Sequence, residues 1–282
     1  PVLVDIPSDV SVAKTDVPLP DRADLPGYKP VVKGNRRQIK RAAEAINQAE
    51  RPVLYVGGGV ILAGASDLLR DLATRAGIPV TTTLMAIGAF PEDHPLSLKM
   101  LGMHGTAYAN YAVQQSDLLI AIGARFDDRI TGDVTTFAPH AKILHVDVDP
   151  TSISKNIGVD IPVVGDAGDV LAGLLELVEE QDRTGWHDQI GAWKEKHPLT
   201  YADEGLKPQY VVQQICEASG GKAIVSTEVG QNQMWAAQWF THRYPRHFLS
   251  SGGLGTMGYG FPSAVGAQAG VPDAIVVDVA GD

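Results

Sequence analysis

The sequence predicts an α/β protein built from two doubly wound parallel sheets, and three observations lead to this class. Short apolar runs such as residues 117–123 (DLLIAIG) are near-continuous, as in strands that are buried on both faces. Segments with apolar residues at three- and four-residue spacing separate these runs, which is the βαβ pattern. Glycine-rich stretches follow several runs, at the position where parallel strands place their ligands.

The composition is that of a soluble globular protein. The 282 residues are 44% hydrophobic and 20% charged, and the formal net charge of −10 argues against non-specific nucleic-acid binding. The single cysteine, Cys216, excludes an internal disulfide and a cysteine metal cluster, and its apolar helical surroundings predict a buried, inert thiol. No apolar run approaches the roughly 18–20 residues of a membrane-spanning helix. With no signal peptide visible, we expect a cytoplasmic protein without membrane or nucleic-acid partners.

The first half of the chain predicts a linker followed by a parallel sheet. Residues 2–6 alternate like a strand, and recurrent prolines over residues 7–34 block regular structure. Gly77 ends the second helix of this half. The expected elements, in order, are a helix over 36–50, a strand over 51–56, a helix with Leu68, Leu69, Leu72 and Ala76 on one face, a strand over 78–83, a long irregular connection over 88–105, strands over 117–123, 142–148 and 161–164, and a helix over 165–181.

The second half predicts another parallel sheet after a polar segment. Residues 182–207 are expected to be irregular with some helix, and Pro208 begins a helix at the position that proline favours. The remaining expected elements are a strand over 222–226, a helix after residue 231, an extended stretch over 246–250, a helix over 261–270 and a strand over 274–279.

Several residues at the expected strand ends allow two interpretations. Gly57-Gly58-Gly59 lacks the third glycine of a G-x-G-x-x-G fingerprint, so it is either a nucleotide-binding turn or a tight strand-to-helix turn. Asp147 can accept a ribose hydroxyl or cap the turn before Pro150. Thr106 is expected to cap a helix whose N-terminus favours anions.

The stretch after residue 123 holds four charges, Arg125, Asp127, Asp128 and Arg129, which suit either a ligand site or a salt-bridged loop. His94 and His104 have no metal-ligand partner at useful spacing, so the sequence gives no reason to expect zinc.

Two pairs of motifs point to a known family. Residues 102–110 (GMHGTAYAN) and 123–132 (GARFDDRITG) resemble the central, FAD-binding domain of the acetohydroxyacid synthase large catalytic subunits, which are thiamine-diphosphate enzymes. Residues 251–267 (SGGLGTMGYGFPSAVGA), with 229–238 (VGQNQMWAAQ) upstream, resemble the thiamine-diphosphate-binding domain of the same enzymes.

The resemblance implies a domain plan and a set of site residues. Residues 1–33 would end a pyrimidine-binding domain and its linker, 34–181 would form the central FAD-binding Rossmann-like domain, 182–207 an interdomain linker, and 208–282 the first part of the thiamine-diphosphate-binding domain. The implied FAD residues are Gly57, Gly58, Gly59, His104, Gly105, Thr106, Arg125, Asp127, Arg129, Asp147 and Asp166. The implied thiamine diphosphate residues are Gln231, Asn232, Gln233, Gly255, Met257 and Gly281, and Asp282 would hold Mg²⁺.

The same resemblance implies a reaction and its partners. Pyruvate would be decarboxylated on thiamine diphosphate, and the two-carbon unit would be added to a second pyruvate or to 2-oxobutyrate. The enzymes work as homodimers or tetramers with a small regulatory subunit. Their activating glutamate would lie in an absent N-terminal domain, so no catalytic residue is assigned here, and the chain alone is expected to be inactive. Phe248 stands where the family often has tryptophan.

Two alternatives remain at this stage. The first is another thiamine-diphosphate enzyme, such as a pyruvate oxidase, a glyoxylate carboligase or an FAD-free catabolic acetolactate synthase. The second is a non-catalytic FAD-binding module.

Overall fold

The computed structural model describes residues 5–18, 21, 31–202 and 204–281. The chain divides into two compact units, residues 1–30 and 31–282. In the first unit, the predicted linker contains one short exposed helix, α1 (Ser8–Val12). The strand predicted over residues 2–6 lies mostly outside the described residues, and Asp5 and Ile6 are not in a strand.

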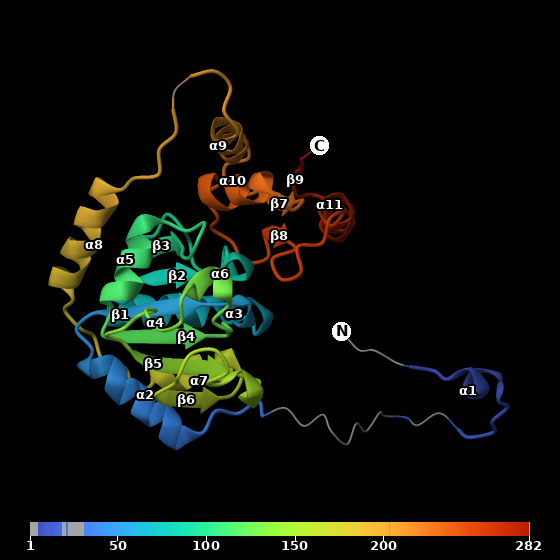
Figure 1. Ribbon diagram of the computed structural model, residues 1–282, viewed down its shortest axis with the longest axis horizontal. Coiled ribbons are helices and arrows are strands. Elements are labelled where there is room, and N and C mark those ends of the chain that lie inside the picture. The colour runs from blue at the N-terminus through green and yellow to red at the C-terminus, as the bar shows by residue number, and fades with distance from the viewer. Residues whose placement is uncertain (1–4, 19–20, 22–30, 203, 282) are drawn as a thin grey trace. The chain divides into compact units, whose positions relative to one another are not determined.

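The second unit begins with a six-stranded parallel sheet in the order β3-β2-β1-β4-β5-β6 (Figure 1). The chain order reverses between β1 and β4, which makes this the doubly wound arrangement with a switch point at that place. The predicted parallel sheet is therefore confirmed, with β3 as one strand more than the five expected from the sequence. Its strands are β1 (Pro52–Val56), β2 (Val80–Thr82), β3 (Ser97–Met100), β4 (Leu118–Ile122), β5 (Lys142–Asp147) and β6 (Ile161–Val164).

Helices cover both faces of this sheet because its strands are apolar on both sides. Along β1, Leu54 and Val56 pack into one core cluster, whereas Val53 and Tyr55 pack into another. The first cluster is covered by α2 (Arg36–Gln48), α3 (Gly58–Leu62), α4 (Ser66–Ala76) and α7 (Ala167–Leu175), and the second by α5 (Ala107–Gln115) and α8 (Thr184–Lys196). The short helices η1 (Leu84–Ala86), α6 (Asp128–Thr131) and η2 (Pro150–Ser152) lie in the loops.

Two sequence expectations need correction, and a third is confirmed in part. The connection over 88–105 is not wholly irregular, because it contains β3. The helix expected within the segment over 182–207 is the 13-residue α8, which buries Trp186 and Ile190 against the first sheet. The helix predicted to reach residue 181 ends at Leu175, and the Gly58-Gly59 pair already belongs to α3.

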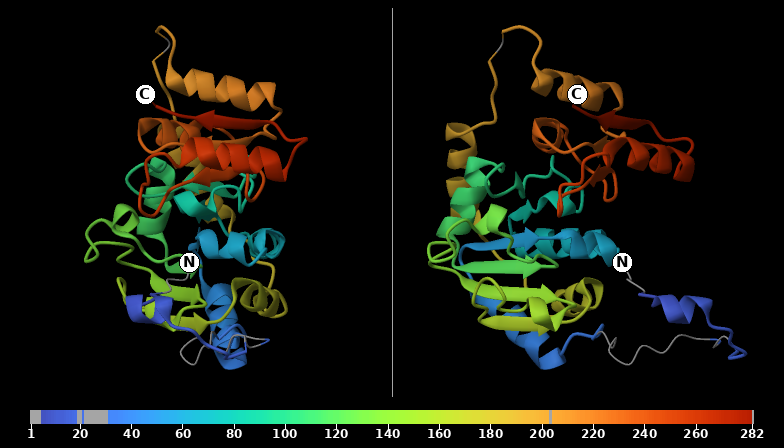
Figure 2. Two further views of the ribbon diagram at one scale, coloured as in Figure 1. Left: turned by 90° about the vertical axis from the view of Figure 1, so that its right-hand side faces the viewer. Right: turned by 45° about the vertical axis from the view of Figure 1, so that its right-hand side comes forward.

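The second sheet has three parallel strands, β8 (Phe248–Ser250), β7 (Ile224–Thr227) and β9 (Val276–Val279), with β7 in the centre. Helices α9 (Pro208–Ala218) and α10 (Gln231–Trp239) bury residues such as Cys216 and Phe240 on one face, which confirms the buried thiol. Helix α11 (Gly260–Gly270) packs on β7 and β9 (Figure 2). Within the described residues, no helix is long and apolar enough to cross a membrane.

Candidate functional site at the carboxyl edges of the two sheets

The backbones after β1 and β4 come into direct contact at the switch point of the first sheet. Gly57 N–H donates to the Ile122 carbonyl (2.9 Å), and Gly59 N–H donates to the Gly123 carbonyl (3.2 Å). A Cβ on Gly57 would lie 2.0 Å from the Gly123 carbonyl oxygen. The glycine at position 57 therefore has a packing role, in agreement with the tight-turn interpretation.

The loop of residues 102–105 lies next to α6 at the same edge. Met103 N–H donates to the Arg129 carbonyl (3.1 Å), which joins the two motifs that were predicted to form one site. Thr106 caps α5 as predicted, because its hydroxyl oxygen accepts from Ala109 N–H (3.2 Å). The His104 carbonyl accepts from the side-chain amide of Gln238 (2.7 Å), so this loop also contacts α10.

The charged loop after β4 presents cations to solvent. The side chains of Arg125 and Arg129 are each 72% exposed, and their carboxylate partners stand 4.0 Å and 3.9 Å away. Such loose, exposed pairs contribute little to stability and leave the guanidinium groups free for a ligand. Asp127, the distant partner of Arg125, also caps α6. A cavity of about 70 Å³ is lined by Arg125, Asp127, Ser152, Lys155 and Asn156.

Asp147 and Asp166 follow the neighbouring strands and already accept hydrogen bonds from the backbone. Asp147 accepts from Asp149 N–H (2.8 Å), and Asp166 caps α7 by accepting from Gly168 N–H (2.8 Å). His145, which was not singled out in the sequence, is fully buried, and its Nε2 lies 3.8 Å from Asp147 Oδ2 and 2.8 Å from the Ala124 carbonyl. Burial lowers the pKa of His145 below its ordinary value, so the ring is neutral at pH 7.

Among the residues assigned to thiamine diphosphate, the three on α10 differ in exposure. Gln231 is exposed, whereas Asn232 and Gln233 are buried. Asn232 donates to the Val279 carbonyl (2.7 Å), and Gln233 donates to the Ser250 hydroxyl (2.5 Å). The two buried amides thus join α10 to the ends of β9 and β8, while Gln231 is available to a ligand.

Glu228 organises the glycine-rich loop of residues 251–260, a role that sequence reasoning missed. Its carboxylate accepts from Gly258 N–H (2.8 Å), Gly260 N–H (2.7 Å) and Phe261 N–H (3.3 Å). Desolvation opposes ionisation of Glu228, but these backbone donors outweigh it and lower its pKa.

The predicted ligand residues of this loop are open to solvent. Met257 is 84% exposed, and Gly255 adopts a φ of +63°. Gly281 is exposed after β9, and Asp282 lies outside the described residues. Loops 228–231, 251–260 and 280–281 all follow parallel strands, so they share one edge of the second sheet.

Replacing Glu228 with alanine is expected to speed amide exchange in residues 252–261 by roughly 10-fold or more, because charge-assisted hydrogen bonds are lost. Hydrogen–deuterium exchange measures the effect, and Glu217→Ala, an exposed glutamate on α9, is the matched control. The pKa of Glu228 is lower in the folded protein than its ordinary value, so the wild-type loop should stay protected from exchange above the ordinary carboxyl pKa. It should lose this protection as the pH falls through the lowered pKa of Glu228. Equal exchange in both variants would show that Glu228 does not hold the loop.

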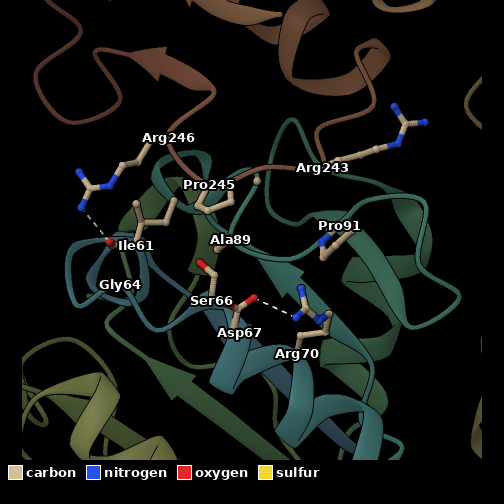
Figure 3. Close-up of a pocket in the computed structure, with 11 residues that line it drawn as sticks. Ile61, Gly64, Ser66, Asp67, Arg70, Ala89, Pro91, Arg243, Pro245 and Arg246 are labelled. Atoms are coloured by element: carbon tan, nitrogen blue, oxygen red, sulfur yellow. Dashed lines mark hydrogen bonds and ion pairs between the residues drawn. The ribbon is translucent and has the colours of Figure 1, made fainter. Parts of the chain in front are cut away.

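A separate cavity of about 140 Å³ lies between α3, α4 and residues 243–246, and no predicted site residue lines it (Figure 3). Three arginines line it, and each has a protein acceptor. Arg70 pairs with Asp67 (2.9 Å), Arg243 with Asp93 (2.6 Å), and Arg246 donates to the Ile61 carbonyl (3.2 Å). Among the described residues, no group of three His, Cys, Asp or Glu side chains is arranged to hold a metal.

Comparison with known proteins gives the chain a family. Residues 39–174 match the thiamine pyrophosphate enzyme central domain, and residues 228–282 match the C-terminal TPP-binding domain of these enzymes. Over its whole length the chain is 50% identical to a probable acetolactate synthase large subunit of Methanocaldococcus jannaschii and 52% identical to the acetolactate synthase large subunit of Corynebacterium glutamicum. It covers 50% and 46% of these two proteins, so the chain spans about half the length of the curated relatives that it matches. The chain belongs to the thiamine pyrophosphate enzyme family.

Proposed function

We propose that this chain is part of the large subunit of an acetolactate synthase. The protein would decarboxylate pyruvate and transfer the two-carbon unit to a second pyruvate or to 2-oxobutyrate, the first common step of branched-chain amino acid synthesis. The observation that carries the proposal is the identity of about 50% along the entire chain to acetolactate synthase large subunits.

The second sheet edge fits a thiamine diphosphate site. The loop held by Glu228 exposes the apolar Met257 next to backbone groups of Gly255, and Gln231 is free on the neighbouring helix. These residues would orient the cofactor, Gly281 would lie beside its diphosphate, and Asp282 would hold Mg²⁺ together with phosphate oxygens. When bound, thiamine diphosphate supplies the electron sink for decarboxylation. The buried Asn232 and Gln233 would act by fixing α10.

The first sheet edge fits FAD in the proposed protein. At the switch point Gly57 is buried against Gly123, whereas Gly58 and Gly59 are half-buried and would meet a flat ligand, and the 102–105 loop with Thr106 lies at the same edge. Arg125 and Arg129 supply exposed, loosely paired cations for a diphosphate. Asp147 and Asp166 would have to give up or share their present backbone partners to bind a ribose.

The remaining assignments belong to the whole protein. We propose a homodimer or tetramer of large subunits with a small regulatory subunit, located in the cytoplasm. The domain boundaries at residues 33/34, 181/182 and 207/208 remain predictions, and α8 packs with the first sheet rather than standing apart as a linker.

Titration of the purified chain with FAD tests the flavin site. We expect saturable binding, seen as quenching of flavin fluorescence, and Arg125→Ala should weaken it by roughly 10- to 100-fold, since one charge-assisted contact is lost. Arg37→Ala, an exposed arginine on α2, is the control and should bind as the wild type does. Equal affinity of Arg125→Ala and wild type would remove Arg125 from the site.

A product assay on the full-length protein tests the reaction. Acetolactate formed from pyruvate without oxygen uptake supports the proposal. Oxygen uptake with acetate or acetyl phosphate as product would indicate a pyruvate oxidase instead, and no turnover of the full-length protein would leave a flavin-binding module.

A further inference from the structure

Lys99 has an unusual backbone at the edge of the first sheet. Its φ is +58°, a conformation that residues other than glycine rarely adopt. It lies in a bulge of β3, because Val80 pairs with Ser97 whereas Thr82 pairs with Met100. Bulges re-aim side chains, and outliers of this kind persist where the surroundings hold them. The Thr81 hydroxyl does so here by donating to the Lys99 carbonyl (2.8 Å).

The re-aimed side chain of Lys99 reaches the other sheet's helix α10. Its ammonium donates to the Gln238 carbonyl near the end of α10 (3.0 Å) and lies 3.6 Å from Glu92 Oε2. The Glu92 side chain is only 3% exposed and that of Lys99 21%, so the pair is largely removed from water. Burial raises the pKa of Glu92 to about 7, and Lys99 opposes this shift. Lys99 thus favours the ionised form of Glu92, and its ammonium lies between that carboxyl group and the Gln238 carbonyl.

Glu92 also holds the chain that leads from α10 to β8. Its N–H donates to the His242 carbonyl (2.9 Å), and its Oε2 accepts from His242 N–H (3.1 Å). The His242 ring is buried and packs edge-on against Phe248 at the start of β8, with ring centroids 4.9 Å apart. One buried carboxylate thus contacts both the lysine that anchors α10 and the segment that positions β8.

These polar contacts stand beside an apolar one. Ile87 and Met100 from the first sheet's side pack with Ala237 of α10. Met234 and Phe248 border the same cluster. The apolar contact brings α10 close, but such contacts are non-directional, so the hydrogen bonds of Lys99 and Glu92 fix its position.

We propose that Lys99 and Glu92 are positioning residues that set the placement of α10 and β8, and thereby of Gln231 and Phe248, from the first sheet. The meaning for catalysis rests on the proposed thiamine diphosphate role of α10. The placement itself depends only on the contacts described above.

Hydrogen–deuterium exchange on the cofactor-free chain tests the proposal. Lys99→Gly removes the ammonium and also relieves the backbone strain at φ +58°. If Lys99 mattered only for the shape of the bulge, this variant would be protected from exchange at least as well as the wild type in every peptide. We expect instead that peptides of α10 and of residues 240–250 exchange roughly 10- to 100-fold faster, as for loss of a charged hydrogen bond. Peptides of α2 and α7 should be unchanged.

Two further variants separate positioning from general destabilisation. Lys99→Arg keeps the charge and should restore most of the α10 protection. The double variant Glu92→Gln/Lys99→Gly leaves no unpaired buried charge, so it should recover thermal stability while α10 still exchanges fast. Lys142→Gly, at an exposed lysine on β5, controls for a lysine-to-glycine change in the first sheet.

Either of two results would overturn the proposal. One is unchanged α10 exchange in Lys99→Gly, and the other is a uniform rise across both sheets in the double variant. Because no cofactor is present, these outcomes are independent of the proposed function. If α10 loosens as expected but the full-length wild type binds no thiamine diphosphate, only the proposed function fails.

Discussion

Replacing Arg183 with methionine is expected to lower the free energy of unfolding by about 2–4 kcal/mol, because it leaves buried helix-end carbonyls without a donor. Arg183 is 5% exposed, and its guanidinium donates to the carbonyls of Ile46 (2.8 Å), Ala49 (3.2 Å) and Ala76. These carbonyls stand at the C-terminal ends of α2 and α4, where a cation also interacts favourably with the helix dipoles. Methionine fills similar space without these bonds.

Urea unfolding followed by far-UV circular dichroism measures this effect, and the melting temperature should fall by roughly 4–16 °C. Arg75→Met is the matched control, because Arg75 also donates to a helix-end carbonyl, that of Leu175 (2.5 Å), but is exposed. Its expected cost is within about 0.5 kcal/mol. If both variants lost the same stability, burial of the Arg183 hydrogen bonds would not be what matters.

Arg183 also illustrates what the sequence can and cannot predict. The strands of the first sheet are visible in the sequence because burial on both faces demands apolar runs such as residues 117–123. The segment around Arg183 has no such signal. Helix α8 meets the sheet with Trp186 and Ile190, with Trp193 packed beside them, and most of its other residues are polar, so its composition resembles that of a linker. Strand β3 is short and contains Lys99 in a bulge, which hides the alternation of a strand.

The residues of the candidate sites were likewise predictable only where their role leaves a signal in the local sequence. Thr106 and the glycines after β1 were predictable because capping and close backbone approach have local sequence signatures. The roles of Glu228 and Lys99 were not, because Glu228 accepts from backbone N–H groups that begin 30 residues further along the chain and Lys99 donates to Gln238, 139 residues away. A carboxylate that accepts backbone donors from a distant loop has the same local sequence as a solvated one. For Glu228, the only hint is its place between a buried strand and Gly230.

Replacing Gly57 with alanine is expected to destabilise the protein by about 3 kcal/mol or more, since the contact at the switch point allows no side chain. The added Cβ would meet the Gly123 carbonyl oxygen at 2.0 Å and the Ala124 Cα at 2.6 Å, both of which are backbone atoms that cannot rotate away. The turn would have to move outward, which breaks the hydrogen bond from Gly57 N–H to the Ile122 carbonyl.

Gly191→Ala is the control for this change. Gly191 lies in α8 with nothing within 4 Å of an added Cβ, so alanine there should stabilise the chain by up to about 1 kcal/mol through helix propensity. Urea unfolding of the two variants should therefore show shifts of opposite sign. If Gly57→Ala unfolded at the wild-type midpoint, the strand ends could separate without cost, and the first sheet edge would be a flexible loop region rather than a preformed site. The expected loss of stability in Gly57→Ala would mean that the contact between Gly57 and Gly123 holds the two strand ends together. This contact leaves no room for a side chain, and it fixes the backbone that forms the proposed flavin site.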